Sequence, residues 1–389
     1  MKDYGIESTG KNMIFYKNLS AIDLSEKIKH YLKFLKYNDI CILNTSDHIE
    51  ILSAFAAWLE SDTGSIAFLN PLLPEKQINY LKKQIHQQTI KSSIVFHTSG
   101  TTGMPKLVIR GKDFMQDQAY NAKYHAELDE KTFFANVVPG STGGFMHIIA
   151  SSWYFNNMNI LLSSKEDLSK DLLNPEINST LIVPGLCDWY KKNNIELPLT
   201  NLKSINTGSS AFYKSHAEFL FDNGAYKINH IYGSTEIGAP VLSKSSNCIN
   251  EQINYLEIND RCKFTENNEL IYNGMHTGDI FIKRDNNQIE FVGRNNDIVK
   301  LNGYFGNLLQ IEKEIEELYP NTETLAIKRT ANGSDYIELM YSGSLQIKRN
   351  DLKLLLQDKL PKCNIPLKCS KVDEIPKNPS NKKVRHLSV

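Results

Sequence analysis

The sequence has 389 residues, of which 41% are hydrophobic and 23% charged, and its 44 basic side chains balance 44 acidic ones. This composition is typical of a folded globular protein with room for more than one domain, and it excludes an intrinsically disordered chain. The balanced charge gives no reason to expect nucleic acid as a partner. The sequence has no uncharged apolar run of about 18 residues, so no membrane span is expected.

Two features favour a cytoplasmic location. The opening residues Met1–Glu7 contain an early acidic residue and no apolar core, so a secretion signal is not expected. The six cysteines are scattered and form no C-x-x-C pair. This spacing is typical of free thiols in a reducing compartment and does not indicate a zinc site.

The N-terminal part of the sequence alternates helix-like and strand-like segments. Residues 40–43 predict a short buried strand, residues 51–59 predict a helix, and Pro74 begins another helix with apolar residues at helical spacing. Further buried strands are predicted at 159–162, 179–183 and 202–205. Strands interleaved with helices predict an α/β fold whose sheets are covered by helices.

A dense run of small polar residues, Thr98 to Lys106, lies between two predicted strands. Apolar residues 94–96 precede it and apolar residues 107–109 follow it, so a strand, a loop and a strand are expected. Its glycines let the backbone approach a ligand, and its N–H groups, hydroxyls and lysine offer donors to an anion. The run predicts a phosphate-binding loop, with a plain surface hairpin as the alternative. No helix follows the lysine, so the loop of nucleoside-triphosphate kinases is a poor match.

The pattern changes near residue 290, where a compact α+β unit is predicted. Its strands and helices are expected at 288–292, 297–301, 308–318, 324–328, 336–341 and 351–360. The polar run 293–297 suits a hinge. The predicted domains are therefore residues 1–295 and residues 296–389.

Four other segments offer chemistry at turns or strand ends. Tyr232 offers an aromatic face to a base, and the nearby Glu236 offers an oxygen ligand to Mg²⁺. Asp279 follows a glycine and suits a pair of ribose hydroxyls. The run 293–303 contributes cations, and the tail 375–385 contains Pro-Lys-Asn-Pro-Ser-Asn-Lys. Each segment alone is equally typical of an ordinary turn or a basic terminus.

Taken in order, these five segments resemble the adenylate-forming superfamily, which holds acyl- and aryl-CoA synthetases, adenylation domains of peptide synthetases and luciferases. The resemblance covers about residues 90 to 389. It implies a large N-terminal domain and a small mobile C-terminal lid. It also implies a reaction in two steps. In the first step, a carboxylic acid reacts with Mg·ATP to give an acyl-adenylate and pyrophosphate. In the second step, a thiol of CoA, or of a carrier protein's phosphopantetheine arm, displaces AMP.

The resemblance implies a role for each matching residue. The implied catalytic residues are Lys382, which would bridge the carboxylate and the α-phosphate, together with Thr235 and Glu236. The implied ATP-binding residues are Thr98, Ser99, Gly100, Thr101, Thr102, Gly103, Lys106, Gly208, Ser209, Ser210, Tyr232, Gly233, Asp279 and Arg294. The implied acid pocket contains Thr142, Gly143, Phe145 and Gly208. Glu236 and Thr102 would lie at Mg²⁺, and Asn296 at the hinge.

Several positions depart from the family pattern. Asn296 replaces the usual acidic or basic hinge residue, Asn381 replaces a glycine, and Thr142 stands at the position of a gating histidine. Gln310 replaces one member of an acidic pair. The phosphate loop also begins nearer the start of the sequence than in typical members, which indicates a short, N-terminally trimmed member.

The leading hypothesis is an acid–thiol ligase for an aryl or short- to medium-chain acid. Small residues flank the implied pocket, and no aspartate stands where an amino-acid ammonium group would be held. The expected partners are a small carboxylic acid and CoA or an acyl- or aryl-carrier protein, with a homodimer as a further alternative. A second hypothesis, suggested by the departures, is a non-catalytic relative that binds nucleotide or acyl-adenylate as a partner subunit. A third is an enzyme that passes its acyl group to an amine or retains the adenylate.

Overall fold

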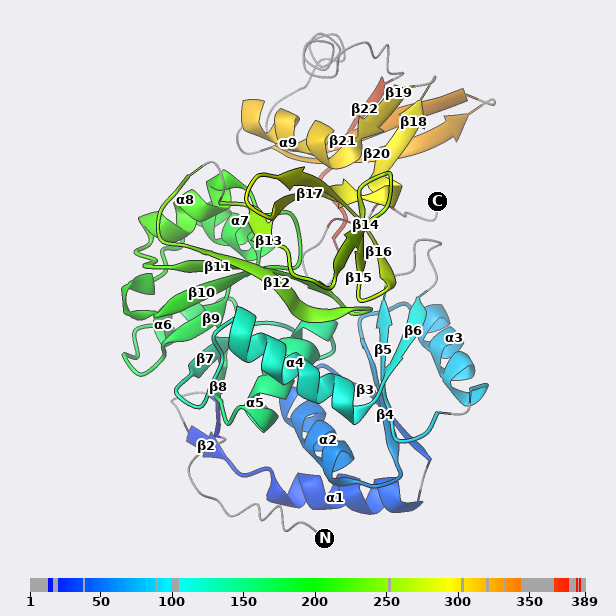
Figure 1. Ribbon diagram of the computed structural model, residues 1–389, viewed down its shortest axis with the longest axis vertical. Helices are drawn as coiled ribbons and strands as arrows, with labels where there is room; N and C mark the ends of the chain where they lie inside the picture. The colour runs from blue at the N-terminus through cyan, green and yellow to red at the C-terminus, as the bar shows by residue number, and fades with distance from the viewer. Residues whose placement is uncertain are drawn as a thin grey trace. The chain divides into compact units, whose positions relative to one another are not determined.

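The computed structural model divides the chain into two compact units, Met1–Asn259 and Asp260–Val389 (Figure 1). The described residues are 13–16, 20–37, 39–88, 90–98, 105–250, 253–301, 304–319, 322–331, 334–343, 367–377, 383 and 385. The division precedes the domain boundary predicted after residue 295, and that functional boundary stays a prediction. None of the helices among the described residues is long and apolar enough to cross a membrane.

A four-stranded sheet in the first unit has the order β3-β4-β5-β6. β3, β4 and β5 are parallel, and β6 pairs antiparallel with β5. One face is covered by α3, whose Ile78, Leu81 and Ile85 pack against the strands as their helical spacing predicts. The elements of this part are α1 (Ser25–Tyr37), β3 (Ile40–Asn44), α2 (His48–Glu60), β4 (Ser65–Leu69), α3 (Glu75–His86), β5 (Ile94–Thr98) and β6 (Lys106–Arg110).

A larger, eight-stranded sheet has the order β12-β11-β10-β9-β7-β8-β1-β2. Its six central strands are parallel, and β2 and β12 pair antiparallel at the two edges. The buried strands predicted from the sequence at 159–162, 179–183 and 202–205 correspond to β8, β9 and β10. The strands are β1 (Ile14–Tyr16), β2 (Ser20–Ile22), β7 (Phe133–Asn136), β8 (Asn159–Leu162), β9 (Ser179–Leu181), β10 (Ser204–Gly208), β11 (Ile228–Ser234) and β12 (Gly238–Ser246).

Helices fill the space between the two sheets and cover the outer face of the larger one (Figure 1). α7 and α8 pack on that outer face. The inner layer contains α2, α4 and a π-helix that continues into α5. The bounds are α4 (Lys112–His125), π-helix η1 (Phe145–Ala150), α5 (Ser151–Phe155), α6 (Leu168–Asp171), α7 (Pro184–Lys192), 3-10 helix η2 (Leu199–Asn201), α8 (Lys214–Asp222) and β13 (Tyr255–Glu257).

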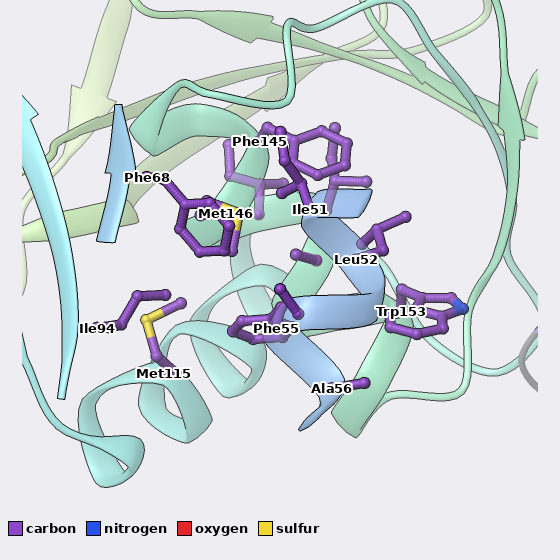
Figure 2. Packing of buried hydrophobic residues seen from close by; sticks show 14 of the residues in the cluster. Ile51, Leu52, Phe55, Ala56, Phe68, Ile94, Met115, Phe145, Met146 and Trp153 are labelled. Carbon is purple, nitrogen blue, oxygen red and sulfur yellow. The ribbon is translucent and has the colours of Figure 1, made fainter. Parts of the chain in front are cut away.

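The inner layer is built around α2. The Asp47 carboxylate begins this helix by accepting a hydrogen bond from the backbone N–H of Ile49 at 2.8 Å. Residues 51–58 of α2 are all buried, as expected for a helix that is apolar all round. Figure 2 shows its Phe55 in the same cluster as Phe68 of β4 and Phe145 of the π-helix. Burying each such ring contributes about 1.5–3 kcal/mol to folding.

The second unit begins with an antiparallel run of strands, β17-β16-β15-β14, and a hairpin of β18 and β19 follows. α9 then packs on a sheet of β20, β21 and β22. The predicted helix at 351–360 lies outside the described residues. The bounds are β14 (Cys262–Phe264), β15 (Glu269–Tyr272), β16 (Met275–Arg284), β17 (Gln288–Arg294), η3 (Asn295–Asp297), β18 (Ile298–Leu301), β19 (Tyr304–Asn307), α9 (Leu308–Leu318), β20 (Glu323–Ala331), β21 (Ser334–Ser342) and β22 (Leu367–Lys371).

Candidate functional site

Three predicted site segments leave the larger sheet at the same edge. β7, β9, β10 and β11 are parallel, so the chain following each of them emerges on one side. These exits carry Thr142 and Gly143 after β7, Gly208–Ser210 at the end of β10, and Tyr232–Glu236 at the end of β11. In open α/β sheets, ligands bind outside the carboxyl ends of the strands. The larger sheet therefore brings the predicted adenine and acid segments to one edge.

At Gly208, the backbones of β10 and β11 approach each other closely. A Cβ atom at this position would lie 2.2 Å from the carbonyl oxygen of Ile231 on the neighbouring strand. Only glycine fits there without moving the backbone. Ser209 follows with a φ of 72°, and both Ser209 and Ser210 are exposed. The strand end thus presents two exposed serines to solvent.

The turn from β11 to β12 carries Thr235 and Glu236, and two distant residues hold it. The Arg110 guanidinium at the end of β6 donates a hydrogen bond to the backbone oxygen of Glu236. On the other side, Oε1 of the buried Gln118 accepts a hydrogen bond from the backbone N–H of Ala239 at 2.7 Å. The strand register also shifts within the preceding Tyr232-Gly233-Ser234 segment. The turn is fixed by α4 and by both sheets.

Arg110 is held in a largely apolar environment. Its guanidinium lies 4.9 Å from the centre of the Phe114 ring, a cation–π distance. Burial lowers the pKa of Arg110, while the charge of Glu236 favours its protonated form. An arginine remains charged at neutral pH despite such a shift. Arg110 therefore brings a fixed positive charge to the Glu236 turn.

The predicted acid-pocket segment contacts this turn. A Cβ atom on Gly143 would lie 2.5 Å from Oγ1 of Thr235, so these two residues touch. The Thr142 hydroxyl donates to the carbonyl of Pro139 at 2.8 Å and accepts from the N–H of Phe145 at 3.3 Å. Thr142 thus begins the helix in the way that a capping residue does.

Phe145 is more deeply buried than Thr142 and Gly143, which are partly buried. It is fully buried in the inner layer, where its ring centroid lies 5.1 Å from that of His48. Figure 2 shows Phe145 packed within the hydrophobic cluster. Its ring has no exposed surface with which to line an open pocket. The assignment of Phe145 to the acid pocket stays a prediction from the sequence, and in this structure Phe145 supports the helix that carries Gly143.

The predicted phosphate loop lies between β5 and β6, as expected. Thr98 and Lys106 are cross-strand partners at the mouth of the loop, and Lys106 is exposed. Lys106 and Arg110 lie at opposite ends of β6, about 13 Å apart for a strand. The remaining predicted loop residues, Ser99 to Gly103, lie outside the described residues.

Two predicted ATP-binding residues face each other in the second unit. Asp279 on β16 and Arg294 on β17 are cross-strand partners, and Nε of Arg294 lies 3.2 Å from Oδ1 of Asp279. Asp279 is buried and Arg294 is exposed. Gly278, with a φ of 72°, donates its N–H to Glu269 at 3.0 Å and shapes the turn before Asp279. Their binding role stays a prediction.

The two remaining predicted residues are the hinge residue Asn296 and the catalytic lysine Lys382. Asn296 lies in the 3-10 turn Asn295–Asp297, and its side chain is not described. Lys382 lies outside the described residues. Their roles therefore stay predictions from the sequence.

Two histidines, His147 and His230, have the surroundings of structural residues. His230 is buried with Nδ1 at 3.3 Å from the carbonyl oxygen of Tyr255, and burial lowers its pKa to about 4. His147 in the π-helix packs against Phe96 and Phe114, with ring centroids 5.1 and 5.5 Å away. Burial and the Arg110 charge lower the pKa of His147 to about 3. Both rings are neutral at physiological pH.

Sequence reasoning missed Arg110 and Gln118. The signal for Arg110 was a charge at the end of an apolar strand directly after the predicted loop. Such a charge often lies in solvent, so the signal is weak. Gln118 had no signal, because an uncharged polar residue within a helix usually faces water.

Comparison with known proteins decides the family. The family described as "AMP-binding enzyme" matches residues 45–265 of the chain. The chain belongs to the AMP-binding enzyme family. The predicted resemblance to the adenylate-forming superfamily is thereby confirmed.

The curated relatives include a long synthase. The chain is 22% identical over 383 residues to bacitracin synthase 1 of Bacillus licheniformis, covering 83% of this chain and 7% of that protein. It is 23% identical over 349 residues to dapdiamide synthesis protein DdaD of Enterobacter agglomerans, covering 76% of this chain and 59% of that protein. The chain thus spans only part of the length of these curated relatives.

Solved adenylate-forming structures share the fold. The O-succinylbenzoate coenzyme A synthetase MenE of Bacillus subtilis, in complex with AMP, aligns with a TM-score of 0.79 at 14% identity, covering 96% of this chain and 94% of that one. ATP-bound MatB of Rhodopseudomonas palustris aligns with a TM-score of 0.74 at 13% identity, covering 95% and 93%. These matches confirm the predicted α/β fold with a large N-terminal and a smaller C-terminal domain.

Proposed function

We propose that this protein is an ATP-dependent acid–thiol ligase. It would activate an aryl or short- to medium-chain carboxylic acid as an acyl-adenylate and then transfer the acyl group to a thiol. The observation that carries the proposal is the contact of Gly143 with Thr235, beside the close approach of Gly208 to Ile231. These contacts bring the predicted acid and nucleotide segments together at one sheet edge, and in open α/β sheets ligands bind outside the carboxyl ends of the strands.

ATP is assigned to the sheet edge by residue type. The exposed Ser209, next to the close backbone approach at Gly208, is assigned to the flat base, with Tyr232 offering its ring. Lys106 is assigned to the phosphates as an exposed cation at the mouth of the loop. Asp279 is assigned to the ribose hydroxyls, with Arg294 holding the carboxylate.

The oxygen ligands expected here, from Glu236 and Thr102, fit a magnesium ion that arrives bound to ATP. No group of three or more His, Cys, Asp or Glu side chains among the described residues is arranged to hold a metal ion. Glu236 would therefore share the ion with phosphate oxygens and water, which is the hard-oxygen set that Mg²⁺ prefers. Thr102, outside the described residues, is assigned beside it. When bound, the ion would neutralise phosphate charge.

The first step joins two anions, so this chain's cations must offset their repulsion. A carboxylate oxygen of the acid attacks the α-phosphorus of ATP, the bond to the bridging oxygen breaks, and pyrophosphate leaves. We assign Lys382 to the approaching carboxylate and the α-phosphate. Arg110 holds the backbone of the Glu236 turn while the charge shifts. Thr235 is assigned to the same turn as a hydroxyl donor.

In the second step a thiolate attacks the acyl carbon, a thioester forms, and AMP leaves with the bonding electrons. The acceptor is CoA or a carrier protein's phosphopantetheine arm. Solved relatives named as coenzyme A synthetases support the first of these. Thr142, which replaces the expected gating histidine, already uses its hydroxyl in helix capping. Any gate for the thiol therefore needs another side chain. The cytoplasmic location and a homodimer stay proposals from the sequence.

The test is ATP–pyrophosphate exchange with the full chain against a panel of aryl, fatty and amino acids. Exchange with one acid class, lost in Lys382→Ala, would support adenylation and identify the acid. The matched control is Lys371→Ala, which removes an exposed lysine from the same unit and should leave exchange intact. No exchange with any acid, while calorimetry detects ATP binding, would instead favour the non-catalytic partner subunit. Supplying CoA or a carrier protein would then separate thiol transfer from retention of the adenylate.

A further inference from the structure

The C-terminal segment of the second unit is anchored on both sides of residues 378–382. Lys377 and Lys383 form an isolated antiparallel bridge, so the chain between them begins and ends at one place. The Lys377 ammonium donates to Glu323 at 2.6 Å. The Lys383 ammonium donates to Glu312 at 3.3 Å and to Glu316 at 2.7 Å. These contacts fix the two ends of the short stretch that contains residue 382.

Arg385 adds a link from this segment to the predicted hinge. Its Nε donates to Oδ1 of Asp297 at 2.8 Å, and its Nη1 donates to the Glu312 carboxylate and, at 3.0 Å, to the carbonyl of Ala326. Asp297 ends the 3-10 turn that contains the predicted hinge position, and its Oδ2 accepts the backbone N–H of Arg294 at 3.3 Å. One guanidinium thus joins the tail, the hinge turn and α9.

Glu312 is the buried centre of this network. It is only 2% exposed, and its Oε1 also accepts the backbone N–H of Ala326 at 2.7 Å. A buried carboxylate needs charged or hydrogen-bonding partners on both oxygens. Burial alone would lower the pKa values of Lys383 and Arg385, but the facing carboxylates outweigh it and raise both. Both cations therefore stay charged wherever the protein is folded near neutral pH.

We propose that Arg385 is a positioning residue for the adenylation step, because it ties the tail that bears residue 382 to the hinge turn and to α9. The proposal rests on the proposed function, in which the Lys382 ammonium must meet a carboxylate and a phosphate at hydrogen-bond distance. A displacement of about 1 Å at such a group can cost about 100-fold in rate. The thiol-transfer step does not use that ammonium. Loss of the Arg385 link should therefore slow the first step selectively.

The main test compares Arg385→Lys and Asp297→Asn with the wild type in two separate assays. Lysine keeps the charge but lacks the planar fork that reaches two carboxylates at once. Asp297→Asn weakens the contact with Arg385 but keeps an oxygen that can accept the Arg294 N–H, and it serves if the Arg385 variant folds poorly. Both variants should lose about 10- to 100-fold of kcat for pyrophosphate exchange with little change in KM for ATP. Both should convert preformed acyl-adenylate to thioester within about 3-fold of the wild type.

The matched control is Arg329→Lys, at another arginine of the same unit whose Nε lies 3.0 Å from Glu338. It should leave both half-reactions unchanged. Equal losses in both half-reactions of Arg385→Lys and Asp297→Asn, with a lowered unfolding midpoint, would overturn the proposal in favour of general stabilisation. Unchanged exchange in both variants, while Lys382→Ala abolishes it, would also overturn it. Unchanged exchange in Lys382→Ala would instead reject the assignment under the proposed function.

A readout independent of activity completes the test. Amide hydrogen exchange of peptides containing the Lys377–Lys383 bridge should become faster in Arg385→Lys than in Arg329→Lys, because the bridge loses an anchor. Equal protection in the two variants would overturn the positioning role even if no acid substrate is found.

Discussion

Replacing Gly208 with alanine should destabilise the first unit, because the new Cβ atom would meet backbone and not a movable side chain. It would lie 2.2 Å from the carbonyl oxygen of Ile231, its partner in the register of β10 and β11. Carbon and carbonyl oxygen normally approach to about 3.3 Å, so the two strands must separate by about 1 Å. Overpacking of this kind costs about 1–3 kcal/mol, which lowers the unfolding midpoint by about 2–12 °C.

The matched control is Gly144→Ala. Gly144 has helical backbone angles, with φ −59° and ψ −42°, and among the described residues no atom outside its chain neighbours and its own helix backbone lies within 4 Å of a Cβ built there. Alanine should stabilise this helical position by about 0.4–1 kcal/mol, because it restricts the unfolded chain. The assay is differential scanning calorimetry of the full chain, with ATP affinity measured alongside. Midpoints of the two variants within about 1 °C of each other would refute the steric reasoning.

Three further predictions concern other contacts. Gln118→Ala removes the acceptor for the Ala239 N–H and should cost about 1–3 kcal/mol in urea denaturation; an unchanged midpoint would contradict this. His147→Phe keeps the ring packing and removes two nitrogens that lack hydrogen-bond partners among the described residues. Because the folded-state pKa of His147 is lowered to about 3, unfolding takes up a proton between about pH 6.5 and pH 3, and acid weakens the fold. From pH 7 to pH 5.5 the wild type should therefore lose about 1 kcal/mol more stability than His147→Phe; parallel losses would argue against that pKa. Asp279→Asn removes the carboxylate that Arg294 faces and should raise the ATP Kd about 10-fold in calorimetry, and an unchanged Kd would reject its ribose role.

Much of the scaffold could be predicted because its signals are local. Short apolar runs bounded by turn residues predicted β3, β8 and β10, and the apolar runs on both sides of the polar loop predicted β5 and β6. The order of five short motifs predicted the family, which the match over residues 45–265 confirmed. Parallel strands then explain why motifs distant in sequence reach one sheet edge.

The contacts that fix the site could not be predicted in the same way. Gln118 and Ala239 are 121 residues apart, and no periodicity connects them. Phe145 shows a second reason why the sequence prediction was incomplete. It begins a π-helix, and because the hydrogen bonds of a π-helix run from i to i+5, its side chains do not lie on the faces expected for an α-helix. The sequence assigned Phe145 to the acid pocket through the family resemblance, and it did not predict the π-helix in which its ring is buried. The two compact units divide after Asn259, whereas the sequence pattern changes only near residue 290, so the boundary predicted after residue 295 stays a prediction.

The bond from Arg110 to the backbone of Glu236 joins residues 126 positions apart in the chain. During synthesis, the strand that bears Arg110 leaves the ribosome long before the turn it holds. A nascent chain that ends before residue 236 lacks one side of the proposed nucleotide site, however well its first sheet has formed. Nucleotide binding would then report completion of the first unit, and ATP in the cell would stabilise finished chains over partial ones by mass action.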